Sequence, residues 1–136
     1  MNGAVSAVDR PFDLDRVMAY QPPMLLVDKY VRDYGVSQSD TFEHFEEVKK
    51  FLAVCASDRS RSFAPSKALD EMWHTFVLFT PDYHQFCSLL GGYIHHRPAA
   101  IDQVAECRAT RDRLRRVFGT INSSLWPEES AACCSD

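Results

Sequence analysis

The sequence predicts an all-α fold, a single-domain bundle of five or six helices in which a helical hairpin carries the main polar motif. Apolar residues recur at helical spacing through most of the chain, and no segment alternates convincingly as a strand. Proline and glycine residues divide the chain into segments of helical length. With 136 residues, 46% of them hydrophobic and 25% charged, the chain can bury a core without disulfides or structural metal ions.

We expect three parts, namely an N-terminal arm (1–11), a helical domain (12–126) and a flexible C-terminal tail (127–136). No apolar run approaches the roughly 18 residues of a membrane span, and none near the start resembles a signal-peptide core. We therefore expect a cytoplasmic protein with no membrane partner. The cysteines lack CxxC spacing and are odd in number, so free thiols are expected at Cys55, Cys87, Cys107, Cys133 and Cys134.

The N-terminal half predicts three helices. A short helix covers residues 12–20, and a second covers residues 24–35 after a pair of prolines. The third begins after a cap at Ser37 or Ser39 and ends near Ser57. We expect its charged residues to face water: Glu43, Glu46, Glu47, Lys49 and Lys50.

The C-terminal half predicts three more helices. The first covers residues 67–79 after a cap at Ser66, and the second covers residues 81–90 after a cap at Thr80. An irregular connector then leads to a long helix over residues 99–118. One apolar stripe of the first of these helices should be core: Leu69, Met72, Trp73 and Phe76.

Asp70 and His74 are the first chemical signal in the sequence. They are four residues apart, so they lie one above the other on a single helix face. Val77 and Leu78 fall on either side of that face, which predicts an apolar setting. A carboxylate and an imidazole buried together need a hydrogen bond, a shared proton or a cation.

His95 and His96 follow the next helix and supply two further imidazoles. A short turn at Thr80 would fold that helix back antiparallel, and its ten residues would travel about 15 Å toward Asp70 and His74. Cys87 should face inward and is most simply a small core residue, with a role as ligand or nucleophile as the alternative. His84 and His44 are expected on the surface.

Two functions of different classes follow from this constellation. The first is a metal-binding helical protein, or a small metalloenzyme, with Asp70, His74, His95 and His96 as candidate ligands. Cys87 and Tyr83 would then contact these ligands, and not the ion, and help to orient them. The expected ion is a divalent transition metal, zinc or iron, and an open coordination position would activate water or dioxygen. The second is a non-catalytic interaction module in which the Asp/His cluster is only a hydrogen-bond network.

The segment LDEMWHTFVLFTPDYHQFCSLLGGYIHHRP resembles the signature of the glycine-rich-domain-containing-protein-like family of small bacterial proteins and plant domains. The pattern runs through an Asp-x-x-Trp-His element, a Thr-x-x-Tyr element, a Phe-Cys pair and a terminal His-His-x-Pro. The matching residues are Asp70, Trp73, His74, Thr80, Tyr83, Phe86, Cys87, His95, His96 and Pro98. The resemblance supports the motif as a unit and implies no particular activity.

Nucleic acid is not an expected partner. The net charge is −4, and the arginines of residues 97–116 alternate with acidic residues. The default interpretation is a solvated, ion-paired face along Arg108, Arg111 and Arg115. We expect the partner to be a small molecule or a protein, and an interaction module would use this arginine face or a flexible Trp126 tail.

Overall fold

The computed structural model describes residues 12–96 and 104–126, and within these ranges every regular element is a helix. The all-α prediction is therefore confirmed. The expected arm, the start of the last helix and the tail beyond residue 126 lie outside the described residues. The helices are α2 (Leu14–Ala19), α3 (Met24–Tyr34), α4 (Gln38–Ser57), α5 (Lys67–Leu78), α6 (Thr80–Leu89) and α7 (Val104–Phe118).

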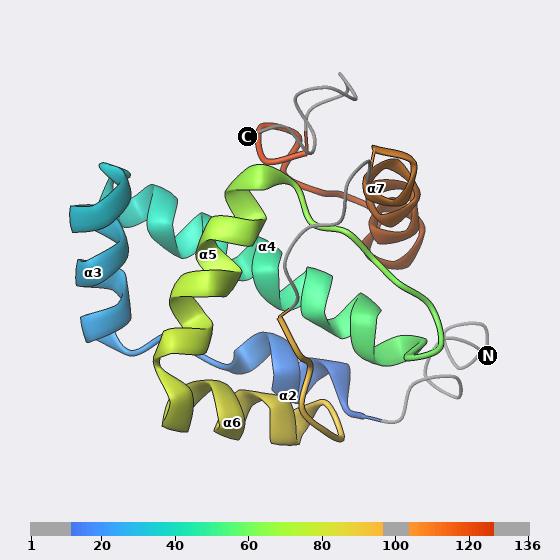
Figure 1. Ribbon diagram of the computed structural model, residues 1–136, viewed down its shortest axis with the longest axis horizontal. Coiled ribbons are helices and arrows are strands. Elements are labelled where there is room, and N and C mark those ends of the chain that lie inside the picture. Colours follow the sequence, from blue (N-terminus) through green and yellow to red (C-terminus); the bar gives the residue numbers. More distant parts are fainter. Residues whose placement is uncertain (1–11, 97–103, 127–136) are drawn as a thin grey trace.

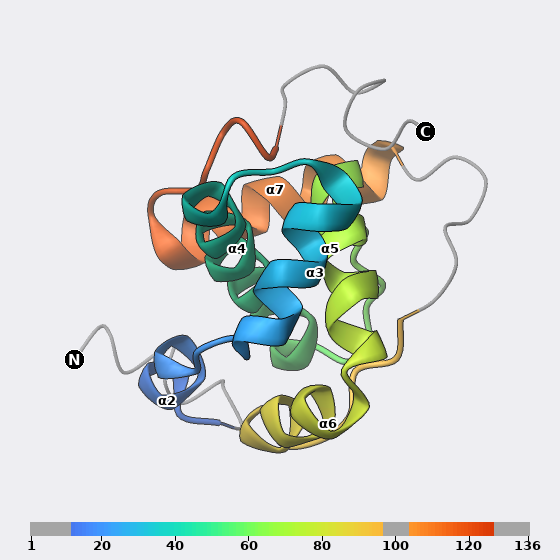
Figure 2. The same ribbon diagram turned by 90° about the vertical axis from the view of Figure 1, so that its left-hand side faces the viewer.

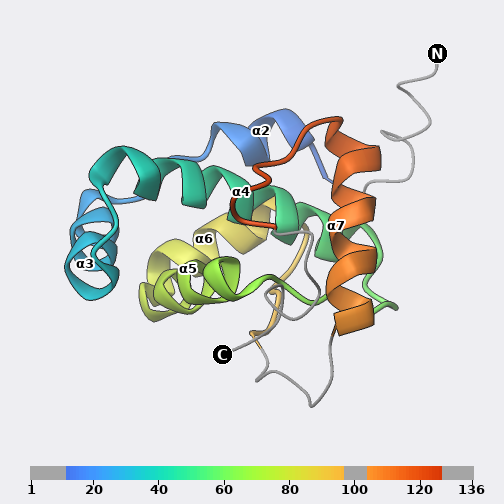
Figure 3. The ribbon, with the colours of Figure 1, turned by 90° about the horizontal axis from the view of Figure 1, so that it is seen from above.

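Helix α4 is the centre of the bundle. It contacts α2, α3, α5 and α7 (Figures 1 and 3). Helices α3, α4 and α5 lie side by side, and α2 and α6 lie together across one end of them (Figure 2). Phe45, Phe51 and Leu52 are fully buried, so α4 supplies several of the large side chains of the core.

Two of the expected helix caps are confirmed. The Ser37 hydroxyl accepts a hydrogen bond from the Asp40 amide at 3.1 Å, and that of Ser66 accepts one from the Leu69 amide at 3.4 Å. The cap expected at Thr80 is wrong, because Thr80 is already the first residue of α6. Phe79 alone separates α5 from α6, which leaves no residue free to serve as a side-chain cap.

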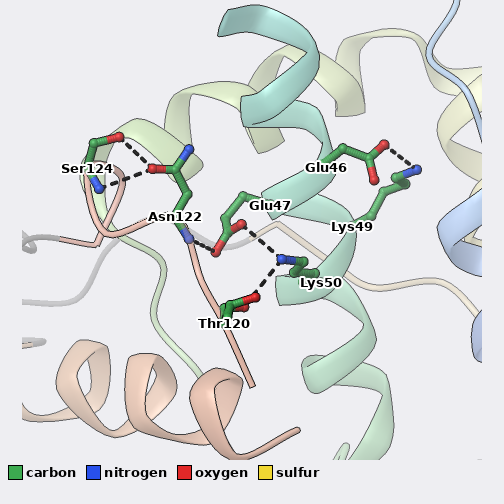
Figure 4. Close-up of polar contacts among 7 residues, drawn as sticks. All are labelled: Glu46, Glu47, Lys49, Lys50, Thr120, Asn122 and Ser124. Carbon is green, nitrogen blue, oxygen red and sulfur yellow. Dashed lines mark hydrogen bonds and ion pairs between the residues drawn. The ribbon is translucent and has the colours of Figure 1, made fainter. Parts of the chain in front are cut away.

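Lys49 corrects the expected solvent face of α4. Its side chain is fully buried, and Nζ donates to the carbonyl oxygens of Met18 at 2.6 Å and Tyr20 at 2.7 Å. The same nitrogen pairs with Glu46 at 2.7 Å (Figure 4). The physical reason is that α2 ends against α4, and the open carbonyls of a helix C-terminus need a donor.

Glu47 is the second buried charge on α4, at 2% exposure, and it also contradicts the expectation. Its carboxylate accepts a hydrogen bond from the Asn122 amide at 3.1 Å and pairs with Lys50 at 3.5 Å (Figure 4). Lys50 in turn donates to the Thr120 carbonyl at 3.5 Å. These contacts fix the segment that follows α7 onto α4.

Trp126 is fully buried and lies 6.4 Å from the Phe51 ring, centroid to centroid. The idea of a flexible tail carrying Trp126 to a partner is therefore wrong, because a large aromatic side chain gains more from burial than from exposure. Arg111, expected on a solvated face, is also buried at 6% exposure, whereas Arg108 and Arg115 are exposed. The arginine face is thus divided between core and solvent.

Expectations for other single residues are partly confirmed and partly wrong. His44, expected on the surface, is half-buried and shares a hydrogen bond of 3.0 Å with the Tyr30 hydroxyl. Cys55 and Cys87 are free thiols, whereas Cys107 is disulfide-bonded. Cys133 and Cys134 lie outside the described residues. The expectation of five free thiols is therefore wrong at Cys107. None of the described helices combines the length and the apolar character needed to cross a membrane.

Candidate functional site

Helix α5 places Asp70 and His74 one turn apart on its outer face. The expected core stripe on the opposite side is confirmed, since Leu69, Met72, Trp73 and Phe76 are all buried. His74 is exposed, and the Asp70 side chain is 46% exposed. The expected burial of this pair is wrong. Its apolar neighbour Leu78 is itself 54% exposed, so none of the described elements covers this end of the face.

The residues after α6 bring the second half of the motif to α5. Helix α6 lies across the end of α5, and the segment that follows, residues 91–96, runs back beside α5 (Figures 1 and 2). This segment makes the return that the sequence analysis assigned to an antiparallel helix. The reason is the single residue between the helices, since a helical hairpin normally has a loop of two to five residues.

His96 is the histidine that reaches Asp70. Its Nε2 atom lies 3.0 Å from Asp70 Oδ1, and its ring centroid lies 5.7 Å from that of His74. The ring also meets the Trp73 indole edge-on at 4.6 Å, and the side chain is only 18% exposed. The His96 ring thus packs on Trp73 on its buried side and binds Asp70 on the side that is open to solvent.

His95 points to a different place. It is exposed, and its ring packs against Tyr93 at 4.8 Å between centroids. Tyr93 also lies 6.2 Å from His84, which is exposed on α6 as expected. Adjacent residues in an extended segment point in opposite directions, which separates His95 from His96. Pro98, the last residue of the motif, lies outside the described residues.

Tyr83 and Cys87 form a buried network behind Trp73. The Tyr83 hydroxyl accepts a hydrogen bond from Trp73 Nε1 at 2.9 Å and donates to the Ile94 carbonyl at 2.5 Å. The Cys87 thiol contacts the same hydroxyl and is 1% exposed. Burial raises the pKa of both Tyr83 and Cys87, so both stay protonated at neutral pH. A protonated, buried thiol is a poor nucleophile.

Arg59 is a contributor that the sequence analysis missed. Its guanidinium donates to the carbonyl oxygens of Leu90, Gly92 and Tyr93, each at 3.1 Å. It thereby holds the start of the segment that carries His96. The only sequence signal was an arginine in a polar loop, and no spacing rule connects position 59 to positions 90–93.

The chemistry available at this site is that of a half-exposed carboxylate (Asp70), one exposed imidazole (His74) and one largely buried imidazole (His96). In the ranges 12–96 and 104–126, no three or more His, Cys, Asp or Glu side chains are arranged, as they lie, to hold a metal ion. Asp70 and His96 instead bind each other directly. The exposed ring of His74 lies beside them, with its centroid 5.7 Å from that of His96.

Comparison with known proteins gives a family and no activity. A family model described as UCP032817-like matches residues 13–125. Neither the curated proteins nor the solved structures contain a match. The description of the family does not include a glycine-rich domain, so the resemblance drawn from the motif stays an expectation.

Proposed function

This chain belongs to the UCP032817-like family, and we propose that it binds one divalent transition-metal ion through Asp70, His74 and His96. The observation that carries the proposal is the 3.0 Å contact between Asp70 Oδ1 and His96 Nε2. Two donor atoms that share an ion at bonds of about 2.1 Å, at right angles, lie about 3 Å apart. A metal ion could therefore replace the direct hydrogen bond without moving either backbone.

His74 completes the donor set. Its ring lies 5.7 Å from that of His96, and a change of rotamer of this exposed side chain would bring a nitrogen to the same ion. Two histidines and one carboxylate with open positions are typical of non-haem iron sites, and closely related sets bind zinc. His95 is left out of the set because its ring packs on Tyr93.

The proposed ion would keep coordination positions open to solvent, because His74 is exposed and Asp70 is half-exposed. An open position is what a metalloenzyme needs to activate water or dioxygen for a small-molecule substrate. The proposal extends to the ion and its ligands and names no substrate.

A second candidate function is a structural one. Asp70 and His96 already form a hydrogen bond of 3.0 Å with each other. This bond favours a purely structural role, in which the pair stabilises the fold of a non-catalytic interaction module. In that case the exposed arginines of α7, Arg108 and Arg115, are the available surface for a protein partner.

The two functions differ in metal content. Protein purified without a polyhistidine tag and stripped with a chelator would be titrated with Co²⁺ and Zn²⁺. We expect one ion per chain, and at least a tenfold loss of affinity in Asp70→Asn, His74→Ala and His96→Ala. His84→Ala and His95→Ala are the matched controls and should bind as the wild type does.

Absence of stoichiometric binding would overturn the metal proposal. The structural role of the Asp70–His96 hydrogen bond would then be supported if His96→Ala lowered the free energy of unfolding while His74→Ala did not, because only His96 bonds Asp70 directly.

A further inference from the structure

The segment that delivers His96 leaves α6 at Gly91 and Gly92, whose amides still donate to the Ser88 and Cys87 carbonyls at 3.3 and 3.1 Å. Gly91 and Gly92 have φ angles of 87° and 156°, which take the chain out of α6 and back toward α5. His96 lies several residues beyond this turn, and each extended residue adds about 3.3 Å of reach. A small change of direction at the turn would therefore move His96 away from Asp70.

Carbonyl oxygens of the turn are satisfied by two side chains from opposite sides. Arg59 binds those of residues 90, 92 and 93, and Tyr83 binds that of residue 94. Tyr83 acts from the core, whereas Arg59 reaches across from the loop after α4. The two contacts together define the path of the chain up to the residue before His95.

Arginine is suited to this position for two reasons. Its planar guanidinium has five N–H donors in a fixed arrangement, so one side chain can serve three diverging carbonyls. Its positive charge also lies at the C-terminal end of α6, where the helix dipole is negative. A lysine has one nitrogen at the end of a flexible chain and cannot reproduce all three contacts.

We infer that Arg59 is a positioning residue that holds His96 against Asp70 and so assembles the metal-binding set. Its role in metal binding rests on the proposed function, but its control of the His96 position does not. Arg59 touches neither Asp70 nor the proposed ion, and it acts only through the backbone of residues 90–93.

The test compares Arg59→Lys with Arg61→Lys in the full chain. Arg61 lies in the same loop, but its guanidinium packs over Phe63 at 5.2 Å. Two measurements use Co²⁺, namely its dissociation constant and the visible spectrum of the complex. Two more use metal-free protein, namely amide hydrogen exchange of Gly92 and the NMR signals of the His96 ring. Far-UV circular dichroism checks that both variants keep their helices.

We expect Arg59→Lys to raise the Co²⁺ dissociation constant at least tenfold and to alter the visible spectrum. In metal-free protein it should speed exchange of the Gly92 amide at least tenfold and shift the His96 signals. Arg61→Lys should change the Co²⁺ dissociation constant and the Gly92 exchange rate less than twofold, and it should leave the visible spectrum and the His96 signals unchanged. If the wild type binds Co²⁺ and Arg59→Lys binds it equally well, the inference is overturned and the proposed function stands.

If the wild type binds no Co²⁺, the proposed function fails, and the metal-free measurements decide the inference alone. Faster Gly92 exchange with shifted His96 signals in Arg59→Lys would then support the positioning role. Unchanged exchange and unchanged His96 signals would refute it.

Discussion

Replacing Trp73 tests how the core supports the candidate site. The indole is 5% exposed, meets the Phe51 ring at 5.2 Å and the His96 ring at 4.6 Å, and donates to Tyr83. A buried tryptophan removes 150–250 Å² from water, which at about 25 cal/mol per Å² gives an upper bound of about 4–6 kcal/mol. We expect Trp73→Ala to cost about 3–5 kcal/mol of unfolding free energy.

Two further variants separate packing from hydrogen bonding. Trp73→Phe keeps an aromatic ring and loses one donor, so it should cost about 1–2 kcal/mol. Tyr83→Phe should cost more, about 2–4 kcal/mol. It leaves two buried groups, Trp73 Nε1 and the Ile94 carbonyl, without their partner.

Chemical denaturation followed by circular dichroism measures these differences, and Trp73→Ala should also lower the thermal midpoint by roughly 10 °C or more. Leu78→Ala, an exposed apolar residue on the same helix, is the control and should change stability by less than about 0.5 kcal/mol. A cost below about 1 kcal/mol for Trp73→Ala, or a larger cost for Trp73→Phe than for Tyr83→Phe, would refute the reasoning.

Two more predictions concern buried polar groups. Lys49→Met should cost about 2–4 kcal/mol in urea denaturation because it leaves the carbonyls at the end of α2 without a donor, whereas Lys29→Met, at an exposed pair with Asp33, should cost under about 1 kcal/mol. A small cost for Lys49→Met would contradict the assignment. Burial raises the pKa of Tyr30 and Tyr83 above the ordinary value of 10.0, so their contribution to stability is complete below pH 10 and is lost as the pH rises further. Tyrosinate absorbance should show these two hydroxyls ionising only together with loss of helix, and full ionisation in a folded protein would disprove the prediction.

Local features of this chain were predictable from its sequence, whereas its long-range contacts were not. Helix boundaries and serine caps were predictable, because Ser37 and Ser66 act on amides three residues away. The pairing of Lys49 with the end of α2 was not, because its partners lie 29 and 31 residues away. A charged residue at a helical position reads as exposed unless its distant partner is known.

The same contrast between local and long-range features applies to the candidate site. The sequence by itself determined the helical spacing of Asp70 and His74, the inward direction of Trp73 and Cys87, and the presence of two histidines after α6. These depend only on the helix period and on the division between apolar and polar side chains.

Only the tertiary structure decided which histidine meets Asp70, and what holds it there. Adjacent side chains of an extended segment point to opposite sides, so His95 and His96 are equivalent until the path of the segment is fixed. That path is set by Arg59 and Tyr83, the first of which lies more than 30 residues away from the carbonyls it binds. The solvent access of His74, and the half-exposure of Asp70, were also tertiary outcomes, because they depend on whether another element covers the helix face and not on the residues within it.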